Sequence, residues 1–393
     1  MDFSLTDEQR AIQEMAREFA HREVDPLVDE TDETQRYPRE VIDKAGGLGF
    51  LGVIFPEEYG GAGLGYVEYV LVVTELSKID PSVGISVAAH NSLCSNHIYK
   101  FGSDEQRRRW LVPLASGKKI GAWSLTEPGA GSDAAGTRTR ADKVDGGWLL
   151  NGAKTFTTHG AVGEICVVFA VTDPQGPRHH NISAFVLDKG MEGFRSGKKE
   201  NKLGIRASDT SEVIMEDCLV GEDRLLGQPG EGFIQALAVL DGGRISIAAL
   251  GLGTAMGAFD AARAYAKERE QFGKPIVAFQ AVQFALAEMA TTIAAAEALT
   301  FAAAEAMDHG RSGVSKLASQ AKLYAGEAAV FCAERGVQIH GGYGFIKDYR
   351  AEKYFRDAKI CTIGEGTSEI QRLVIARHLL KRRPTAGSAG DPR

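Results

Sequence analysis

The chain has 393 residues, of which 44% are hydrophobic and 25% are charged, an average composition for a globular protein. This length exceeds one ordinary hydrophobic core, so we expect two or three domains. A formal net charge of −7 argues against a nucleic-acid surface, which usually needs a basic face.

Residues 1–120 are predicted to form a helical domain. Thr6 followed by Gln9 makes a capping box, which is a sequence signature of a helix start. Another helical pattern, from Val67 to Leu76, follows a glycine-rich loop at residues 57–65.

Residues 121–229 are predicted to form a β domain. Turn clusters such as Asp145-Gly146-Gly147 separate short β-rich runs, which are Trp148 to Leu150, Ile165 to Val171, Ile182 to Leu187 and Glu212 to Val220. Because no long helical pattern lies between these runs, we expect a largely antiparallel sheet rather than a doubly wound one.

Residues 230–383 are alanine-rich, with apolar residues at helical spacing. The helical runs lie near 233–272, 276–309, 314–340 and 349–380. Long helices with short connections predict an antiparallel four-helix bundle. The predicted fold class is therefore α+β multidomain, in the order helical domain, β domain and helical bundle, with a disordered tail at 384–393.

The cysteines and histidines show no metal-binding pattern. The five cysteines are scattered and form no Cys-x-x-Cys pair, so we expect a reducing compartment without disulfides. The nine histidines contain no His-Glu-x-x-His arrangement, and no metal site is predicted. The longest apolar run, Ile245 to Phe259, is too short for a bilayer, and the start of the chain lacks a signal-peptide pattern. We expect a cytoplasmic protein with no membrane or nucleic-acid partner.

Three loops carry the residues best suited to chemistry. The loop from Ile363 to Glu369 places Glu365 between two glycines, so a flat ligand can approach the carboxylate and the backbone beside it. A second loop, Leu125 to Asp133, offers backbone N–H groups that suit a phosphate or a polar ring. A third, Gln338 to Phe345, has glycines where a predicted helix ends. Each loop alone also fits a structural role, as a helix start, a domain-joining turn or a helix end.

Two glycine patterns imitate nucleotide-binding motifs. Gly129 to Ala134 matches Gly-x-Gly-x-x-Ala, but strands follow it, whereas a dinucleotide site needs a following helix in a βαβ unit. We therefore do not expect a Rossmann site. Gly251, Gly253 and Gly257 lie inside a predicted helix and are better explained by close helix packing.

Together, the three loops resemble the signatures of the acyl-CoA dehydrogenase family, and the resemblance spans nearly the whole chain. The third loop continues through Asp348, Lys353 and Asp357 as in the family's C-terminal pattern, and the details look closest to short-chain, butyryl-CoA-like and short/branched-chain members. The resemblance implies FAD as cofactor, an acyl-CoA substrate, electron-transfer flavoprotein as electron acceptor, and a homotetramer built from dimers.

The resemblance also assigns roles to individual residues. The implied FAD-contacting positions, partly supplied by a neighbouring subunit, are Trp123, Leu125, Thr126, Gly131, Ser132, Phe156, Thr157, Thr158, Arg269, Phe272, Gln280, Gln338, Gly341, Gly342, Thr367 and Glu369. The implied substrate-contacting positions are Ser132, Asp241, Arg244 and Gly366. Glu365 aligns with the catalytic base, which removes the α proton of the thioester while the flavin takes a hydride from the β carbon. Burial under the acyl group is expected to raise the pKa of Glu365 toward the working pH.

Three positions depart from the family pattern. Ser124 stands where a smaller residue is usual, Phe156 where many relatives have Trp, and Gly364 where many have Tyr. The cavity beside the base is therefore expected to be wider. Isovaleryl-type members carry their base at the position of Gly243, so this chain has no substitute carboxylate there.

Other functions remain open on the same fold. The alternative is an acyl-CoA oxidase or another flavoenzyme, and the least favoured is a catalytically silent binding or scaffold protein. The length and branching of the acyl chain stay open.

Overall fold

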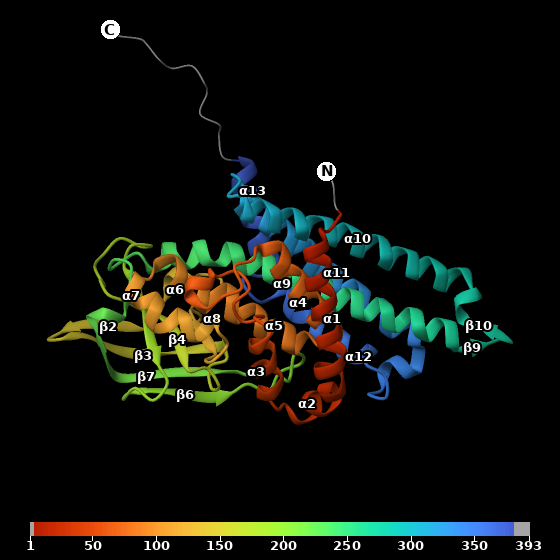
Figure 1. The fold of residues 1–393 in the computed structure, drawn as a ribbon, viewed down its shortest axis with the longest axis horizontal. Coiled ribbons are helices and arrows are strands. Elements are labelled where there is room, and N and C mark those ends of the chain that lie inside the picture. The colour runs from red at the N-terminus through yellow and green to blue at the C-terminus, as the bar shows by residue number, and fades with distance from the viewer. Residues whose placement is uncertain (1–3, 381–393) are drawn as a thin grey trace, which may run out of the picture.

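The computed structural model describes residues 4–380, and the tail predicted at 384–393 lies outside that range. Figure 1 shows a β-sheet at one end of a long helical body. The chain passes from helices to the sheet and back to helices, as the sequence predicted.

The first region is helical. Helix α1 (Asp7–Phe19) begins with the predicted capping box between Thr6 and Gln9. The other helices are α2 (Val28–Thr34), α3 (Arg39–Gly47), α4 (Tyr66–Ile79), α5 (Pro81–Ala89), α6 (Asn96–Phe101), α7 (Asp104–Gln106) and α8 (Val112–Ala115), and several are joined by short turns of 3₁₀ or π helix.

The middle region is an eight-stranded sheet with strand order β6-β7-β3-β2-β4-β5-β8, in which β1 pairs with β4. Its strands are β1 (Gly121–Ser124), β2 (Arg140–Val144), β3 (Gly147–Thr158), β4 (Ile165–Val171), β5 (Ile182–Asp188), β6 (Phe194–Lys199), β7 (Thr210–Gly221) and β8 (Leu225–Leu226). Pairing is antiparallel except where β4 meets β1 and β2, so the predicted largely antiparallel sheet is confirmed. The four predicted runs fall in β3, β4, β5 and β7, and β2 begins at the end of the segment 137–140, which was also expected to be a strand, whereas the shorter or more polar β1, β6 and β8 were not predicted.

The last region is a helical bundle. Its elements are α9 (Gly232–Glu268), a hairpin of β9 (Glu270–Gln271) and β10 (Lys274–Pro275), α10 (Gln280–Asp308), α11 (Val314–His340), α12 (Ala351–Ala358) and α13 (Ser368–Leu380). The single helix predicted over 349–380 is wrong. The chain breaks there because Glu365 and Gly366 adopt left-handed backbone angles, with φ of 53° and 94°.

Helix α9 is the axis of the molecule, and glycines bring it close to its neighbours. A Cβ atom at Gly253 would lie 2.4 Å from the Thr74 carbonyl oxygen in α4, and one at Gly251 would lie 2.8 Å from the Ala325 oxygen in α11. The interpretation of these glycines as packing residues is confirmed. Helix α9 thus joins the first helical region to the bundle in one core.

Helices α9 and α10 are long and apolar enough to cross a membrane by length and composition alone. The apolar window of α9 is 67% buried inside the protein, as expected for a core helix, whereas that of α10 is 22% buried. On α10, Met289 and Ile293 are buried, but Phe284 is 60% exposed. One long face of α10 therefore lacks a partner within the described chain.

Candidate active site

Glu365 lies in the loop between α12 and α13, on a backbone held by two side chains. The Gly366 carbonyl oxygen accepts hydrogen bonds from Lys322 Nζ at 2.7 Å and from Gln371 Nε2 at 2.9 Å. Gln371 also donates to the Glu365 carbonyl oxygen at 3.3 Å. Side chains from α11 and α13 therefore fix the peptide that carries the carboxylate.

The Glu365 carboxylate has free hydrogen-bonding capacity. Its Oε2 atom is buried and has no hydrogen-bond partner among the described residues. Burial raises the pKa of Glu365 to about 7, although the positive charges of Lys322 and Arg244 oppose this rise. The backbone N–H of Glu365 is likewise unpaired within the described chain. A carboxylate with a pKa near neutrality is suited to accept a proton at physiological pH.

Glu365 packs directly against α9. A Cβ atom at Gly243 would lie 1.9 Å from Glu365 Oε2, so only glycine leaves the carboxylate in this position. The neighbouring Arg244 is 5% exposed, forms an ion pair with Asp241, and has an unpaired Nε within the described chain. The predicted base and two predicted substrate contacts are therefore close together.

Trp123 on β1 is held by two consecutive hydrogen bonds through a buried histidine. Its indole N–H donates to His97 Nδ1 at 3.2 Å, and His97 Nε2 lies 3.0 Å from Gln235 Oε1. Because the indole nitrogen is only a donor, His97 must be neutral and carry its proton on Nε2. Burial supports this state by lowering the pKa of His97 to about 4. Trp123 also packs against the apolar cluster of Ala89, Leu93 and Val239.

The loop from Leu125 to Asp133 rests on a buried ion pair. Lys154 Nζ on β3 lies 2.7 Å from Glu127 Oε1 and 3.3 Å from the Leu125 carbonyl oxygen. Beyond this anchored part, Gly131 and Ser132 are exposed, and their backbone N–H groups are unpaired among the described residues. Successive free N–H groups form a favourable position for an anion.

The residues at the end of β3 point in different directions. Phe156 has a φ of 55° and is 66% exposed, at an irregularity in the pairing of β3 with β7. Thr157 is buried, and its hydroxyl lies 2.6 Å from that of Ser124, which gives the departure at Ser124 a structural role. Thr158 is partly buried. Phe156 and Thr158 are therefore more accessible to a ligand than Thr157.

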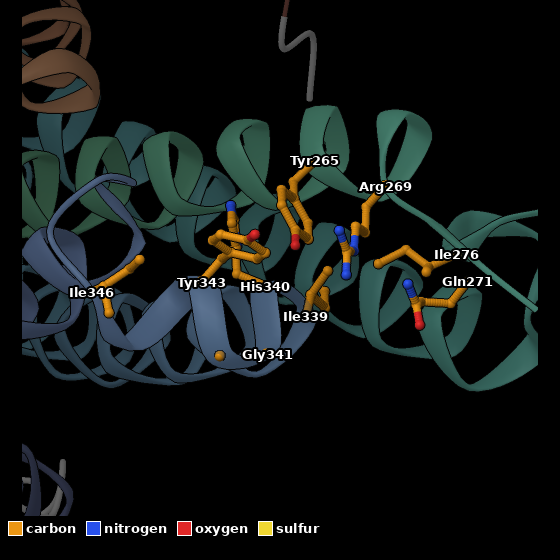
Figure 2. Close-up of a pocket in the computed structure, with 10 residues that line it drawn as sticks. Tyr265, Arg269, Gln271, Ile276, Ile339, His340, Gly341, Tyr343 and Ile346 are labelled. Atoms are coloured by element: carbon orange, nitrogen blue, oxygen red, sulfur yellow. The ribbon is translucent and has the colours of Figure 1, made fainter.

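The remaining predicted FAD contacts form a separate cluster. Arg269, Gly341 and Gly342 line an open cleft of about 520 Å³ together with Tyr265 and His340, whose rings are stacked. Figure 2 shows Arg269, Tyr265, His340 and Gly341 at this cleft. Also exposed near it are Phe272, Gln280 and Gln338. Arg244, a predicted substrate contact beside the base, lies about a third of the way along α9, whereas this cluster lies at the C-terminal end of α9, roughly 36 Å away at ~1.5 Å per residue. Within one chain the cluster is therefore far from the base loop.

Thr367 and Glu369 lie beside the base loop rather than in that distant cluster. They line a second cleft, of about 450 Å³, together with Lys359 and Ile363. Thr367 Oγ1 also accepts from the Ile370 N–H at 3.4 Å, so Thr367 caps α13, which agrees with the interpretation of this loop as a helix start.

Comparison with protein families matches almost the whole described chain. The N-terminal, middle and C-terminal domain models of acyl-CoA dehydrogenase match residues 6–118, 122–218 and 230–380. The chain belongs to the acyl-CoA dehydrogenase family. It is therefore an oxidoreductase with the three-domain acyl-CoA dehydrogenase fold, within a family of flavoproteins.

Relatives of the short-chain type are similar to nearly the whole chain. The short-chain-specific acyl-CoA dehydrogenase of Clostridium acetobutylicum is 46% identical over 97% of this chain and 100% of its own. Butyryl-CoA dehydrogenase of Megasphaera elsdenii superposes with a TM-score of 0.95 at 43% identity, covering 97% and 100% of the two chains. A chain in a structure described as electron transferring flavoprotein of Acidaminococcus fermentans has a TM-score of 0.96 at 49% identity, with the same coverage.

Sequence reasoning missed the residues whose hydrogen bonds and ion pairs hold the predicted site residues in place. Lys322, His97 and Lys154 were not predicted, because each acts through a partner far away in the sequence. Gln371 was not predicted either, although its partner carbonyls are only five and six residues away. Lone polar residues on apolar helix or strand faces give no local signal of such partners. Within residues 4–380 no cluster of three potential metal ligands is found.

Proposed function

We propose that this acyl-CoA dehydrogenase uses FAD to convert acyl-CoA thioesters into trans-2-enoyl-CoA, with Glu365 as the base. The observation that carries this proposal is the unpaired, buried Glu365 carboxylate, whose pKa is raised to about 7. A purely structural carboxylate in this position would be expected to have hydrogen-bond partners.

The residues present fit an FAD molecule. The unpaired N–H groups of Gly131 and Ser132 suit its pyrophosphate, and the exposed Phe156 offers an aromatic surface beside a flat ring. Arg269, in the open cleft, suits a phosphate or an adenine. When bound, FAD supplies the acceptor for the hydride that leaves the substrate's β carbon.

The protein's own residues carry the proton chemistry. The Glu365 carboxylate takes the proton from the α carbon, and the charge that develops on the thioester oxygen is stabilised by a hydrogen bond from the Glu365 N–H. Arg244 and Asp241 then contact the CoA part of the substrate. Protonation leaves Glu365 neutral, which suits a buried position.

The cofactor site is shared between subunits of a homotetramer. Support comes from the separation of the predicted FAD contacts within one chain, since Thr367 and Glu369 line the cleft beside the base loop whereas Arg269 lines the other cleft. Arg244, which lies beside the base, is roughly 36 Å from the Arg269 cluster along α9, more than one compact ligand pocket spans. The exposed Phe272 and the open face of α10 are suited to helix packing between copies of the chain.

Short or branched acyl chains are the proposed substrates, and electron-transfer flavoprotein is the proposed acceptor. The similarity to butyryl-CoA dehydrogenase supports the first, and the similarity to a chain in an electron-transferring-flavoprotein structure supports the second. A Cβ at Gly364 would be in ordinary van der Waals contact with Ile360, at 3.6 to 3.8 Å, and glycine leaves the volume of any larger side chain unfilled beside the base.

The test compares wild type with Glu365→Gln under anaerobic conditions. Purified wild type is expected to show flavin absorbance with about one FAD per chain, and butyryl-CoA should bleach it. Glu365→Gln should retain FAD and bind butyryl-CoA but bleach at least 10²-fold more slowly, because general base catalysis typically contributes about 10²–10⁴-fold. Bleaching at the wild-type rate would exclude Glu365 as the base.

Two further measurements define the substrate and the acceptor. Rates with butyryl-, isobutyryl-, 2-methylbutyryl- and medium-chain acyl-CoA should be highest for a short or branched chain. Reduced enzyme should pass electrons to electron-transfer flavoprotein, whereas stoichiometric hydrogen peroxide during turnover would identify an acyl-CoA oxidase instead.

A further inference from the structure

Buried lysines in the described chain differ in their partners. Lys154 pairs with Glu127 at 2.7 Å, and Lys353 pairs with two aspartates at 2.7 and 2.6 Å. Lys322 is also fully buried, yet within residues 4–380 it has no carboxylate within 4 Å. Because burial of an unpaired charge is costly, this lysine needs a separate explanation.

The buried neighbours of Lys322 on its own helix are mostly alanines. On its own helix it is flanked by Ala318, Ala321 and Ala325, all fully buried. Its one hydrogen bond among the described residues runs from Nζ to the Gly366 carbonyl oxygen, at 2.7 Å. That carbonyl belongs to the residue directly after Glu365.

We propose that Lys322 is a positioning residue for the Glu365 carboxylate. Its hydrogen bond holds the Gly366 carbonyl and therefore the left-handed peptide at Glu365, and its charge favours the ionised form of the base. This inference rests on the proposed role of Glu365 as the proton acceptor.

The two contributions of Lys322 are separable because Gln371 binds the same carbonyl. Gln371 Nε2 donates to the Gly366 oxygen at 2.9 Å, so the peptide has a neutral anchor as well as a charged one. Only Lys322 adds a positive charge. A variant that keeps a donor but loses the charge therefore differs from one that loses both.

Other titratable groups near the loop also act on Glu365 and Lys322. Arg244 from α9 is the second cation that acts on Glu365, and Asp241 partly neutralises it. Cys361 before the loop and Glu369 on α13 face Lys322. Burial lowers the pKa of Lys322 to about 8, and that of Glu365 is raised to about 7, so both groups are charged mainly between these values.

The test uses the FAD-loaded enzyme and two substitutions, Lys322→Gln and Lys322→Met. Flavin bleaching by butyryl-CoA is followed as a function of pH, together with FAD content and thermal melting. Lys322→Met should bleach roughly 10²-fold more slowly at pH 7, because a small misplacement of a catalytic group can cost that much. Lys322→Gln should recover most of the rate at high pH. In both variants the rising limb of the pH profile should move to higher pH, because loss of the nearby positive charge raises the pKa of Glu365.

The matched control is Lys316→Met, on the same helix, where the lysine forms no ion pair among the described residues. It should leave rate and pH profile unchanged. The inference would be overturned if the Lys322 variants melted at lower temperature but bleached at the wild-type rate with an unchanged pH profile. Lys322 would then be a structural residue only. If Lys322→Met does not fold, the inference is decided by whether the rising limb of the pH profile of Lys322→Gln moves to higher pH. Glu365→Gln is measured alongside, because its failure to slow bleaching would overturn the proposed function itself.

Discussion

Left-handed backbone at non-glycine residues marks several predicted ligand positions. Phe156, Phe272 and Glu365 have φ values of 55°, 55° and 53°. Such conformations are costly for residues with a Cβ atom, and they concentrate where a site needs a side chain in one orientation. At Glu365 this strain is combined with burial of an unpaired oxygen.

Glu365→Gln is expected to stabilise the cofactor-free protein at high pH. The pKa of Glu365 is raised to about 7 in the folded chain, above its ordinary value of 4.5, so the fold binds this proton more tightly than the unfolded chain does. The contribution of Glu365 to the free energy of unfolding is therefore fully present below pH 4.5 and is lost as the pH rises to about 7. The loss is about 3–4 kcal/mol at most, at about 1.36 kcal/mol for each unit of the pKa difference between 4.5 and about 7.

Urea unfolding of the cofactor-free proteins at pH 5 and pH 8 measures this effect. The variant should gain stability over wild type at pH 8 and much less at pH 5. An equal difference at both pH values would show that ionisation of Glu365 does not limit stability.

Strand β3 supports the loop from Leu125 to Asp133 through one buried side chain. Lys154 reaches under the loop to Glu127 and to the Leu125 carbonyl, and Glu127 also accepts from the N–H groups of Arg138 and Thr139 at 2.7 and 3.0 Å. The loop is therefore held by a buried network rather than by apolar packing alone.

Lys154→Met should destabilise the protein by about 3 kcal/mol, because it leaves the Glu127 carboxylate buried without its counter-charge. It should also release FAD more readily during dialysis. The control is Lys143→Met, which breaks the ion pair between Lys143 and Glu222. Because these two side chains are 51% and 67% exposed, the control should lower the free energy of unfolding by less than about 1 kcal/mol. Unfolding midpoints in urea compare the two, and equal losses would contradict a special role for Lys154.

The three regions of the whole molecule meet at a buried charged triad. Lys353 on α12 lies between Asp80, at the start of α5, and Asp357. Asp357 also accepts from the Ile205 N–H of the middle region at 2.5 Å. These contacts give the family signature positions Lys353 and Asp357 a structural role in joining the regions.

Mixed oligomers should show whether the cofactor site is shared. Glu365→Gln removes the base, and Arg269→Ala with Gln338→Ala weakens the distant cluster, so each variant alone should be nearly inactive. In a mixed dimer with a shared site, one of the two sites has an intact base from one chain and an intact cluster from the other. Co-expression and tandem-tag purification should therefore restore up to about half the wild-type activity per mixed dimer. Two copies of the same variant carrying different tags are the control, and absence of recovery would indicate a site within one chain.

Local patterns in the sequence were sufficient for much of the architecture. The capping box at Thr6, the apolar strand runs and the helix end at Gly341 depend on residues within a few positions of one another, which is the range over which backbone preferences act. The loops with Glu365 and Gly131 were recognised for the same reason, since glycine and carboxylate patterns are local.

Only the tertiary structure decided how these loops are supported and where they lie. The break at Glu365 depends on packing against Gly243 and on hydrogen bonds from Lys322, which the helical pattern of residues 349–380 does not contain. The exposure of Phe284, despite its place on an apolar stripe, depends on which neighbours α10 has. The physical reason is that periodicity specifies which face of an element is apolar, whereas burial, charge compensation and hydrogen-bond partners arise from segments that meet only in the folded chain.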